Sequence, residues 1–136
     1  MAGMVPNEGI TELFALGGGI SGTAFGYIAC GSGNTAFTSA SSELNTEITT
    51  ANGLPRAAST ESLEDSGSGF TDDTLRFVKA FTVTGTQTVK EIGVTNKGTK
   101  DAAGEKWLYL EVLGTERALV SGNTYTVTVN VVGARV

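Results

Sequence analysis

Residues 124–132 read TYTVTVNVV, and this stretch decides the fold class. One tyrosine and three valines alternate strictly with threonine and asparagine over the first eight residues. Because successive side chains of a strand point to opposite faces, this period of two predicts a half-buried antiparallel strand. The preceding triplet Ser121-Gly122-Asn123 is typical of a turn.

Other stretches rich in β-forming residues precede this one, separated by turns such as Asn52-Gly53-Leu54-Pro55 and the polar turn at residues 64–69, EDSGSG. We expect strands or extended segments over residues 25–31, 56–63, 74–84, 88–96, 107–113 and 117–120, whereas residues 43–50 fit either a helical turn or a strand. The 107–113 stretch, WLYLEVL, is apolar on both faces for most of its length. Lys79 interrupts one apolar face and suggests a bulge or an exposed strand end. Strands of this length without helices between them predict an all-β fold, a single antiparallel β-sandwich.

The N-terminal segment has the pattern of a short helix. Asn7 can cap it, because its side chain can accept a hydrogen bond from a free amide of the first turn. Ile10, Leu13 and Phe14 then share one face. Three glycines, residues 17–19, end the helix and begin a Gly-rich N-terminal arm.

A length of 136 residues predicts one domain, residues 1–136. Within it we expect residues 1–24 to form the helix and the Gly-rich arm, and residues 25–136 to form the strands. No stretch approaches about 18 consecutive apolar residues, so we expect no membrane span and no membrane partner. The first basic residue is Arg56, so we expect no secretory leader.

The composition lacks common catalytic residues. Histidine is absent and Cys30 is the single cysteine. These counts exclude Ser-His-Asp triads, Cys-His dyads, histidine metal ligands and paired-cysteine redox motifs. We therefore predict no enzyme, with no catalytic, cofactor-binding or metal-binding residue and no cofactor. Cys30 lies in an apolar strand and is expected to be a small buried hydrophobe.

The net charge of −5 is unevenly distributed. Residues 1–75 carry nine acids and one base, Arg56, whereas residues 76–136 carry eight bases and five acids. An acidic chain whose bases are scattered does not fit binding to a phosphate backbone, so nucleic acid is not an expected partner. Segments of opposite charge suit docking between copies or on a charged lattice.

Two motifs resemble ligand sites, and each has a simpler interpretation. Residues 17–22, GGGISG, match G-x-G-x-x-G, but they follow a helix where a dinucleotide site needs a preceding strand, so we interpret them as a helix stop and linker. Five acids offer the oxygen ligands that calcium prefers, but their spacing fits no EF-hand loop and a solvated loop is the favoured interpretation. They are Glu61, Glu64, Asp65, Asp72 and Asp73.

Three further patterns leave alternatives open. Trp107 and Tyr109 are expected on one face of a strand, where they could stack on a sugar, although a core position is favoured. Two acids on different strands could converge for glycoside hydrolysis, but nothing in the sequence selects a pair. The threonines at 124, 126 and 128 form a row like that of flat assembly or ice-binding faces, and a solvent face is favoured.

A set of segments together resembles small virion structural proteins of tailed bacteriophages. In those proteins a short helix with an N-x-G motif precedes a YIAIGTG-like strand and turn, and later strands form a T-G-containing hairpin and a final V-T-rich strand. Here the matching segments are VPNEGITELFAL, FGYIACGSGNTA, ELNTEI, LPRAAST, FVKAFTVTGTQTVKEIGVTN and VSGNTYTVTVNV. The sequence departs from the pattern at Cys30, where an aliphatic residue is expected, and at Val94, where leucine is expected.

The resemblance implies a β-rich part of the particle, made in the host cytoplasm and located in the virion. The expected function is that of a capsid decoration (cement) protein that binds the major capsid protein. Copies of the chain are also expected to bind one another, with a homotrimer as the candidate assembly. The alternative is a tail-fibre or baseplate component with a receptor- or sugar-binding role. A carboxylate-dependent hydrolase is the third candidate.

Overall fold

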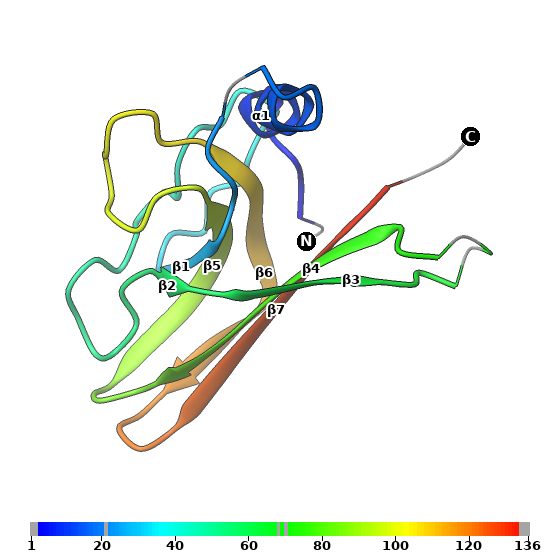
Figure 1. Cartoon of the computed structure of the whole chain (residues 1–136). Coiled ribbons are helices and arrows are strands. Elements are labelled where there is room, and N and C mark those ends of the chain that lie inside the picture. Colours follow the sequence, from blue (N-terminus) through cyan, green and yellow to red (C-terminus); the bar gives the residue numbers. More distant parts are fainter. Residues whose placement is uncertain (1–2, 21, 68, 70, 134–136) are drawn as a thin grey trace.

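One helix and seven strands make up the part of the chain that this computed structural model describes, residues 3–20, 22–67, 69 and 71–133 (Figure 1). The elements are α1 (Asn7–Gly17), β1 (Tyr27–Gly31), β2 (Ala57–Ala58), β3 (Thr60–Glu64), β4 (Thr74–Thr82), β5 (Gln87–Thr95), β6 (Trp107–Leu119) and β7 (Thr124–Val132).

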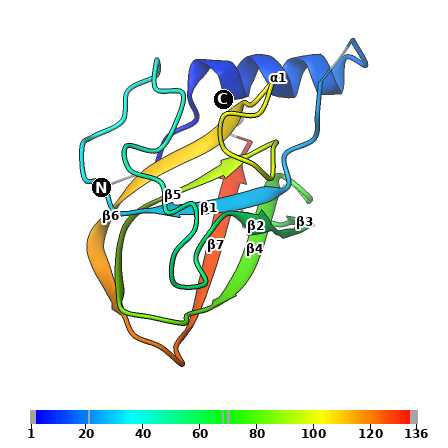
Figure 2. The ribbon, with the colours of Figure 1, turned by 90° about the vertical axis from the view of Figure 1, so that its left-hand side faces the viewer.

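The strands form two antiparallel sheets. The four-stranded sheet has the order β2-β1-β5-β6, and the three-stranded sheet has the order β3-β4-β7. Short connections after β4 and after β6 carry the chain from one sheet to the other, at the lower end of the molecule in Figures 1 and 2. This arrangement confirms the predicted single antiparallel β-sandwich with a short N-terminal helix.

The main core lies between the two sheets and contains side chains from both. Phe77, Phe81, Val127 and Val129 come from the three-stranded sheet, and each is at most 3% exposed. The four-stranded sheet contributes Ile28, Cys30, Val89, Ile92, Val94 and Leu108. Burial of this apolar surface is the dominant favourable contribution to folding.

A second, smaller cluster lies on the outer face of the four-stranded sheet. It consists of Ala29, Leu44, Trp107 and Leu110, and Phe37 from the loop after β1 packs against it. The same loop therefore covers a face that would otherwise be exposed. Because this loop covers one face and the main core covers the other, the first half of β6 is buried on both faces, as the apolar sequence predicts.

The β7 strand has the bounds and the alternating burial that the sequence predicts. Val127 and Val129 are buried, while Thr126 and Thr128 are exposed. The predicted turn at Asn52-Gly53 is also present, with φ values of 60° and 75°. Both lie in the left-handed region, which asparagine and glycine tolerate better than other residues.

Four sequence-based predictions of strands need correction. β1 begins at Tyr27 and not at residue 25, and the extended segment 56–63 divides into β2 and β3, which belong to different sheets. The segments 107–113 and 117–120 form one continuous strand, β6. No bulge occurs at Lys79, because the β4–β7 register continues through the Lys79–Val127 pair.

The predicted capping role of Asn7 is wrong. Pro6 occupies the N-cap position of α1 without a side-chain hydrogen bond, and Asn7 is the first helical residue. The glycine stop is confirmed: Gly18 is the C-cap, and Gly19 follows with a φ of 64°. Ser21, in the predicted arm, and Ser68, in the predicted 64–69 turn, lie outside the described residues. In the described part of the chain, no helix has the length and hydropathy needed to cross a membrane.

Candidate functional site

An apolar groove separates α1 from the end of the three-stranded sheet. Its volume is about 660 Å³. We call it the α1 groove; its apolar lining comes from Val5, Ile10, Leu13 and Phe14 on the helix side and from Leu63, Leu75, Val131 and Val132 on the sheet side. Figure 1 shows the sheet end projecting to the right, beyond the other sheet, with α1 above.

The sheet side of the groove is built by strand register. Leu75 of β4 pairs with Leu63 of β3 and with Val131 of β7, so one apolar side chain from each strand forms a row across the sheet. The next row inward contains Phe77, which is buried in the main core. The apolar surface of the core therefore continues into the groove.

The groove exposes large apolar side chains. Phe14 is 75% exposed, Leu63 is 60% exposed and Ile10 is 42% exposed. A second hollow of about 370 Å³ shares Leu13 and Leu75 with the groove, so the two form one continuous apolar surface along α1. Contiguous exposed apolar surface of this kind marks sites of interaction with other molecules.

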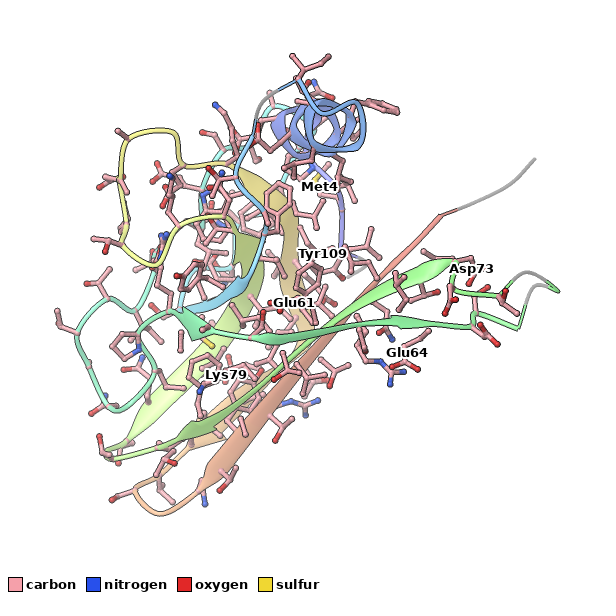
Figure 3. All side chains as sticks on the ribbon, in the orientation of Figure 1. Met4, Glu61, Glu64, Asp73, Lys79 and Tyr109 are labelled. Atoms are coloured by element: carbon pink, nitrogen blue, oxygen red, sulfur yellow. The ribbon has the colours of Figure 1, made fainter. Side chains whose placement is uncertain are left out.

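Acidic residues border this apolar surface. Asp72 and Asp73 line the α1 groove, Glu61 lines the second hollow, and neither lining contains a lysine or an arginine. Figure 3 shows Glu61, Glu64 and Asp73 spaced along the β3–β4 hairpin toward its tip. The charge pattern favours a partner with apolar side chains flanked by basic ones.

Close contacts with β6 fix the position of α1. A Cβ at Gly9 would lie 2.4 Å from the Trp107 carbonyl oxygen, so only glycine permits this approach of helix to strand. The Trp107 amide donates a hydrogen bond of 2.8 Å to Glu8. Burial raises the pKa of Glu8, while this hydrogen bond and the positive charge of Lys106 act in the opposite direction. Met4 also pairs with Leu110 through two backbone hydrogen bonds.

A buried ionic cluster holds two loops against the four-stranded sheet. Arg56 donates to both carboxylate oxygens of Glu47, at 2.8 and 2.6 Å, and it also donates to Glu105. A further bond of 3.0 Å reaches the carbonyl oxygen of Lys97, and the guanidinium lies 5.1 Å from the centroid of the Trp107 ring. Burial alone lowers the pKa of Arg56, but its bonds to the two glutamates outweigh this effect and raise it. These two carboxylates converge, as the hydrolase alternative requires, but both are occupied by Arg56.

Glu91 is a second buried acid with a structural role. Its side chain is 0% exposed and accepts hydrogen bonds from the Thr46 amide at 2.6 Å and from the backbone and side-chain nitrogens of Asn45 at 3.1 and 2.9 Å. A Cβ at Gly31 would lie 2.3 Å from one Glu91 oxygen, which explains glycine at that position. Neither Glu91 nor the Arg56 cluster was predicted from the sequence. The position of Arg56 as the single base in residues 1–75 is the one available signal.

Three of the five acids weighed as calcium ligands, Glu64, Asp65 and Asp73, contact groups of their own hairpin. Asp65 accepts the Asp72 amide at 2.8 Å, and Asp73 accepts the backbone N–H and the hydroxyl of Ser66. Glu64 lies 3.4 Å from Arg76. Across the described residues, no group of three or more acidic or cysteine side chains is arranged to hold a metal ion.

The expectation that Trp107 and Tyr109 share one strand face is wrong. The β5–β6 register shifts between the Val94 and Thr95 pairs, so an extra residue, Leu108, separates them. Trp107 is therefore in the outer cluster, 0% exposed, while Tyr109 packs against the main core and donates to Glu111 at 3.1 Å. A buried indole cannot stack on a sugar, which removes the residue pair proposed for that role.

Cys30 lies in the core, as predicted. It is 0% exposed, and burial, together with the negative charge of Glu47, raises the pKa of its thiol to about 12. The glycine-rich 17–22 segment begins at the last residue of α1, and the described residues after it contain no helix, so the strand–turn–helix setting of a dinucleotide site is not found there. The threonine row at 124, 126 and 128 is exposed on the outer face of β7.

Comparisons with known proteins add no assignment: no protein-family model, no curated protein and no solved structure matches this chain.

Proposed function

We propose that the protein is a non-enzymatic structural component of a tailed-phage virion, a capsid decoration protein that binds the major capsid protein and stabilises the shell. The resemblance of its strand and turn segments to small virion proteins supports this proposal. The absence of histidine and the presence of one buried cysteine fit a protein without catalytic chemistry. The β-sandwich is compatible with it, although a fold by itself does not determine a function.

The observation that carries the proposal is the α1 groove. An exposed phenylalanine from α1 and an exposed leucine from β3 both line this apolar groove, which has acids at its border. A capsid-protein segment with apolar residues and neighbouring bases would bury these side chains and neutralise the acids. Many such contacts repeated over a lattice raise the overall affinity without requiring strong binding by one copy.

Rebinding to decoration-free capsids tests the role of the groove. Phe14→Ser and Leu63→Ser each remove an apolar side chain that is more than half exposed, so the fold should be retained while capsid binding falls at least about fivefold, as for an anchor residue worth over 1 kcal/mol. Val120→Ser is the matched control, because Val120 is 53% exposed and lies outside the groove. Equal binding by all three variants and the original protein would contradict docking through this groove.

Location and effect on the shell test the function itself. Bound protein should raise the temperature at which decoration-free capsids release their contents, and antibody labelling in electron micrographs should mark the shell. Labelling confined to the tail would overturn the capsid proposal in favour of a fibre or baseplate role.

A further inference from the structure

The β7 strand has a free edge along its whole length. In the three-stranded sheet it pairs with β4 alone, and no backbone hydrogen bond joins its other side to another segment of the described chain. The Gly133 amide donates to the Asp73 carbonyl oxygen in the continuation of the β4–β7 register. Antiparallel pairs alternate, so the odd-numbered residues of β7 bond β4 and the even-numbered residues direct N–H and C=O groups to the free edge.

This edge lacks the features that prevent strand addition. The nine residues of β7 contain no proline, no glycine and no charged side chain. The other sheet edges differ: β2 has two residues, β3 has five and includes Glu61 and Glu64, and β6 is bridged by Met4 and carries charges in its second half. Short, charged or covered edges resist pairing with another chain, whereas a long uncharged edge promotes it.

We propose that two copies of the chain associate edge to edge through β7, in antiparallel orientation around a two-fold axis at Thr128. In this register Thr128 faces its own counterpart, Thr126 faces Asn130, and Thr124 faces Val132. Counting both copies, five pairs of even-numbered residues face each other. Their N–H and C=O groups point to the shared edge, so the five pairs would exchange about ten backbone hydrogen bonds. On the outer face threonine then lies opposite threonine or asparagine, except at the strand ends, where Thr124 lies opposite Val132; on the inner face valine lies opposite valine or tyrosine.

The second copy is the partner that the charge distribution favours. The chain carries a net charge of −5, so two copies repel at most surfaces. β7 is uncharged, and the outer side chains of β4 beside it are threonine, alanine and valine except for Arg76, which donates to Asn130. Pairing through β7 therefore brings two uncharged strands together and leaves the acidic β3–β4 hairpin tips at opposite ends of the extended sheet.

Charge variants at the two-fold axis test the proposal. The unmodified protein should show twice its 13.9 kDa mass by sedimentation velocity at high concentration. Thr128→Lys and Thr128→Glu should each sediment as a monomer, because like charges would face each other, and an equal mixture of the two should form a dimer again. Ala80→Lys, on the same face but one strand away from the axis, should leave the dimer intact. Circular dichroism should show that every variant remains folded.

Hydrogen exchange of the unmodified protein gives a test that needs no substitution. Amides of Thr126, Thr128 and Asn130 should become protected as concentration rises, while those of Val127 and Val129 should be protected throughout because they bond β4. A monomeric or trimeric mass at all concentrations would overturn the proposal. So would a dimer that Thr128→Lys leaves unchanged, or a mixture of the two charge variants that stays monomeric.

Discussion

Replacement of Arg56 tests whether the buried ionic cluster stabilises the fold. Arg56→Met keeps much of the apolar length of the side chain but removes the guanidinium from between Glu47 and Glu105. The side chains of Arg56 and Glu47 are 3% and 1% exposed, and that of Glu105 is 12% exposed. The variant would therefore leave two poorly solvated carboxylates without their cation.

The expected cost is large because it combines several losses. Removing one partner of a buried ion pair destabilises a protein by about 3–5 kcal/mol, and the contact with the Trp107 ring adds about 1 kcal/mol at most. Against a total stability of about 5–15 kcal/mol, this is a substantial fraction. With a urea dependence of about 2 kcal/mol per molar, the unfolding midpoint should fall by about 2 M. Arg56→Lys keeps the charge but not the paired bonds to Glu47, so we expect an intermediate loss.

Urea unfolding followed by fluorescence measures this loss, since Trp107 is the single tryptophan. Arg76→Met is the matched control, because the Arg76–Glu64 pair is more than a third exposed and should change stability by about 0–1 kcal/mol. The double variant Arg56→Met with Glu47→Gln should lose less unfolding free energy than the sum of the two single losses, because the second change removes one uncompensated charge. Equal midpoints for Arg56→Met and Arg76→Met would refute the reasoning.

Two further predictions concern the helix and the cysteine. Gly9→Ala should lower the free energy of unfolding by about 1–3 kcal/mol, because its Cβ would meet the β6 backbone. Gly17→Ala is the control: open space surrounds this position, so the change should be neutral or stabilising by up to about 1 kcal/mol. Equal urea midpoints for the two variants would contradict this prediction. Cys30, with its thiol pKa raised to about 12, should react with a disulfide reagent at pH 8 about a thousandfold more slowly in native than in urea-unfolded protein. A native rate close to the unfolded rate would show that the thiol is accessible and has an ordinary pKa.

Local patterns explain why the sequence predicted much of the fold. β7 alternates without interruption, and the turns at Asn52-Gly53 and Ser121-Gly122-Asn123 contain residues suited to positive φ. Such patterns need only neighbouring residues, so a single sequence is enough to identify them. The helix was likewise predicted from its apolar spacing, but its cap was not, because Pro6 fills that position without the side-chain bond that the prediction assumed.

Long-range contacts explain what the sequence did not predict. The insertion of Leu108 as a bulge is set by pairing with β5, and it reversed the expected relation between Trp107 and Tyr109. Glu91 binds a loop 45 residues earlier in the chain, so its burial has no local signature. The α1 groove also depends on register, since it forms where a row of three strand residues extends past the helix. None of these features follows from spacing within one segment.

The groove and the free edge belong to the same sheet, and this connects the two proposals. Val131 lines the α1 groove on the inner face of β7, while the even-numbered residues beside it form the edge proposed for dimer formation. A two-fold axis perpendicular to the sheet keeps both inner faces on the same side, so both grooves of a dimer would open in one direction. A dimer could then bind two neighbouring lattice sites at once, and the second contact would form at high effective concentration. The Thr128→Lys variant separates the two proposals, because it should weaken capsid binding through lost avidity while leaving each groove unchanged.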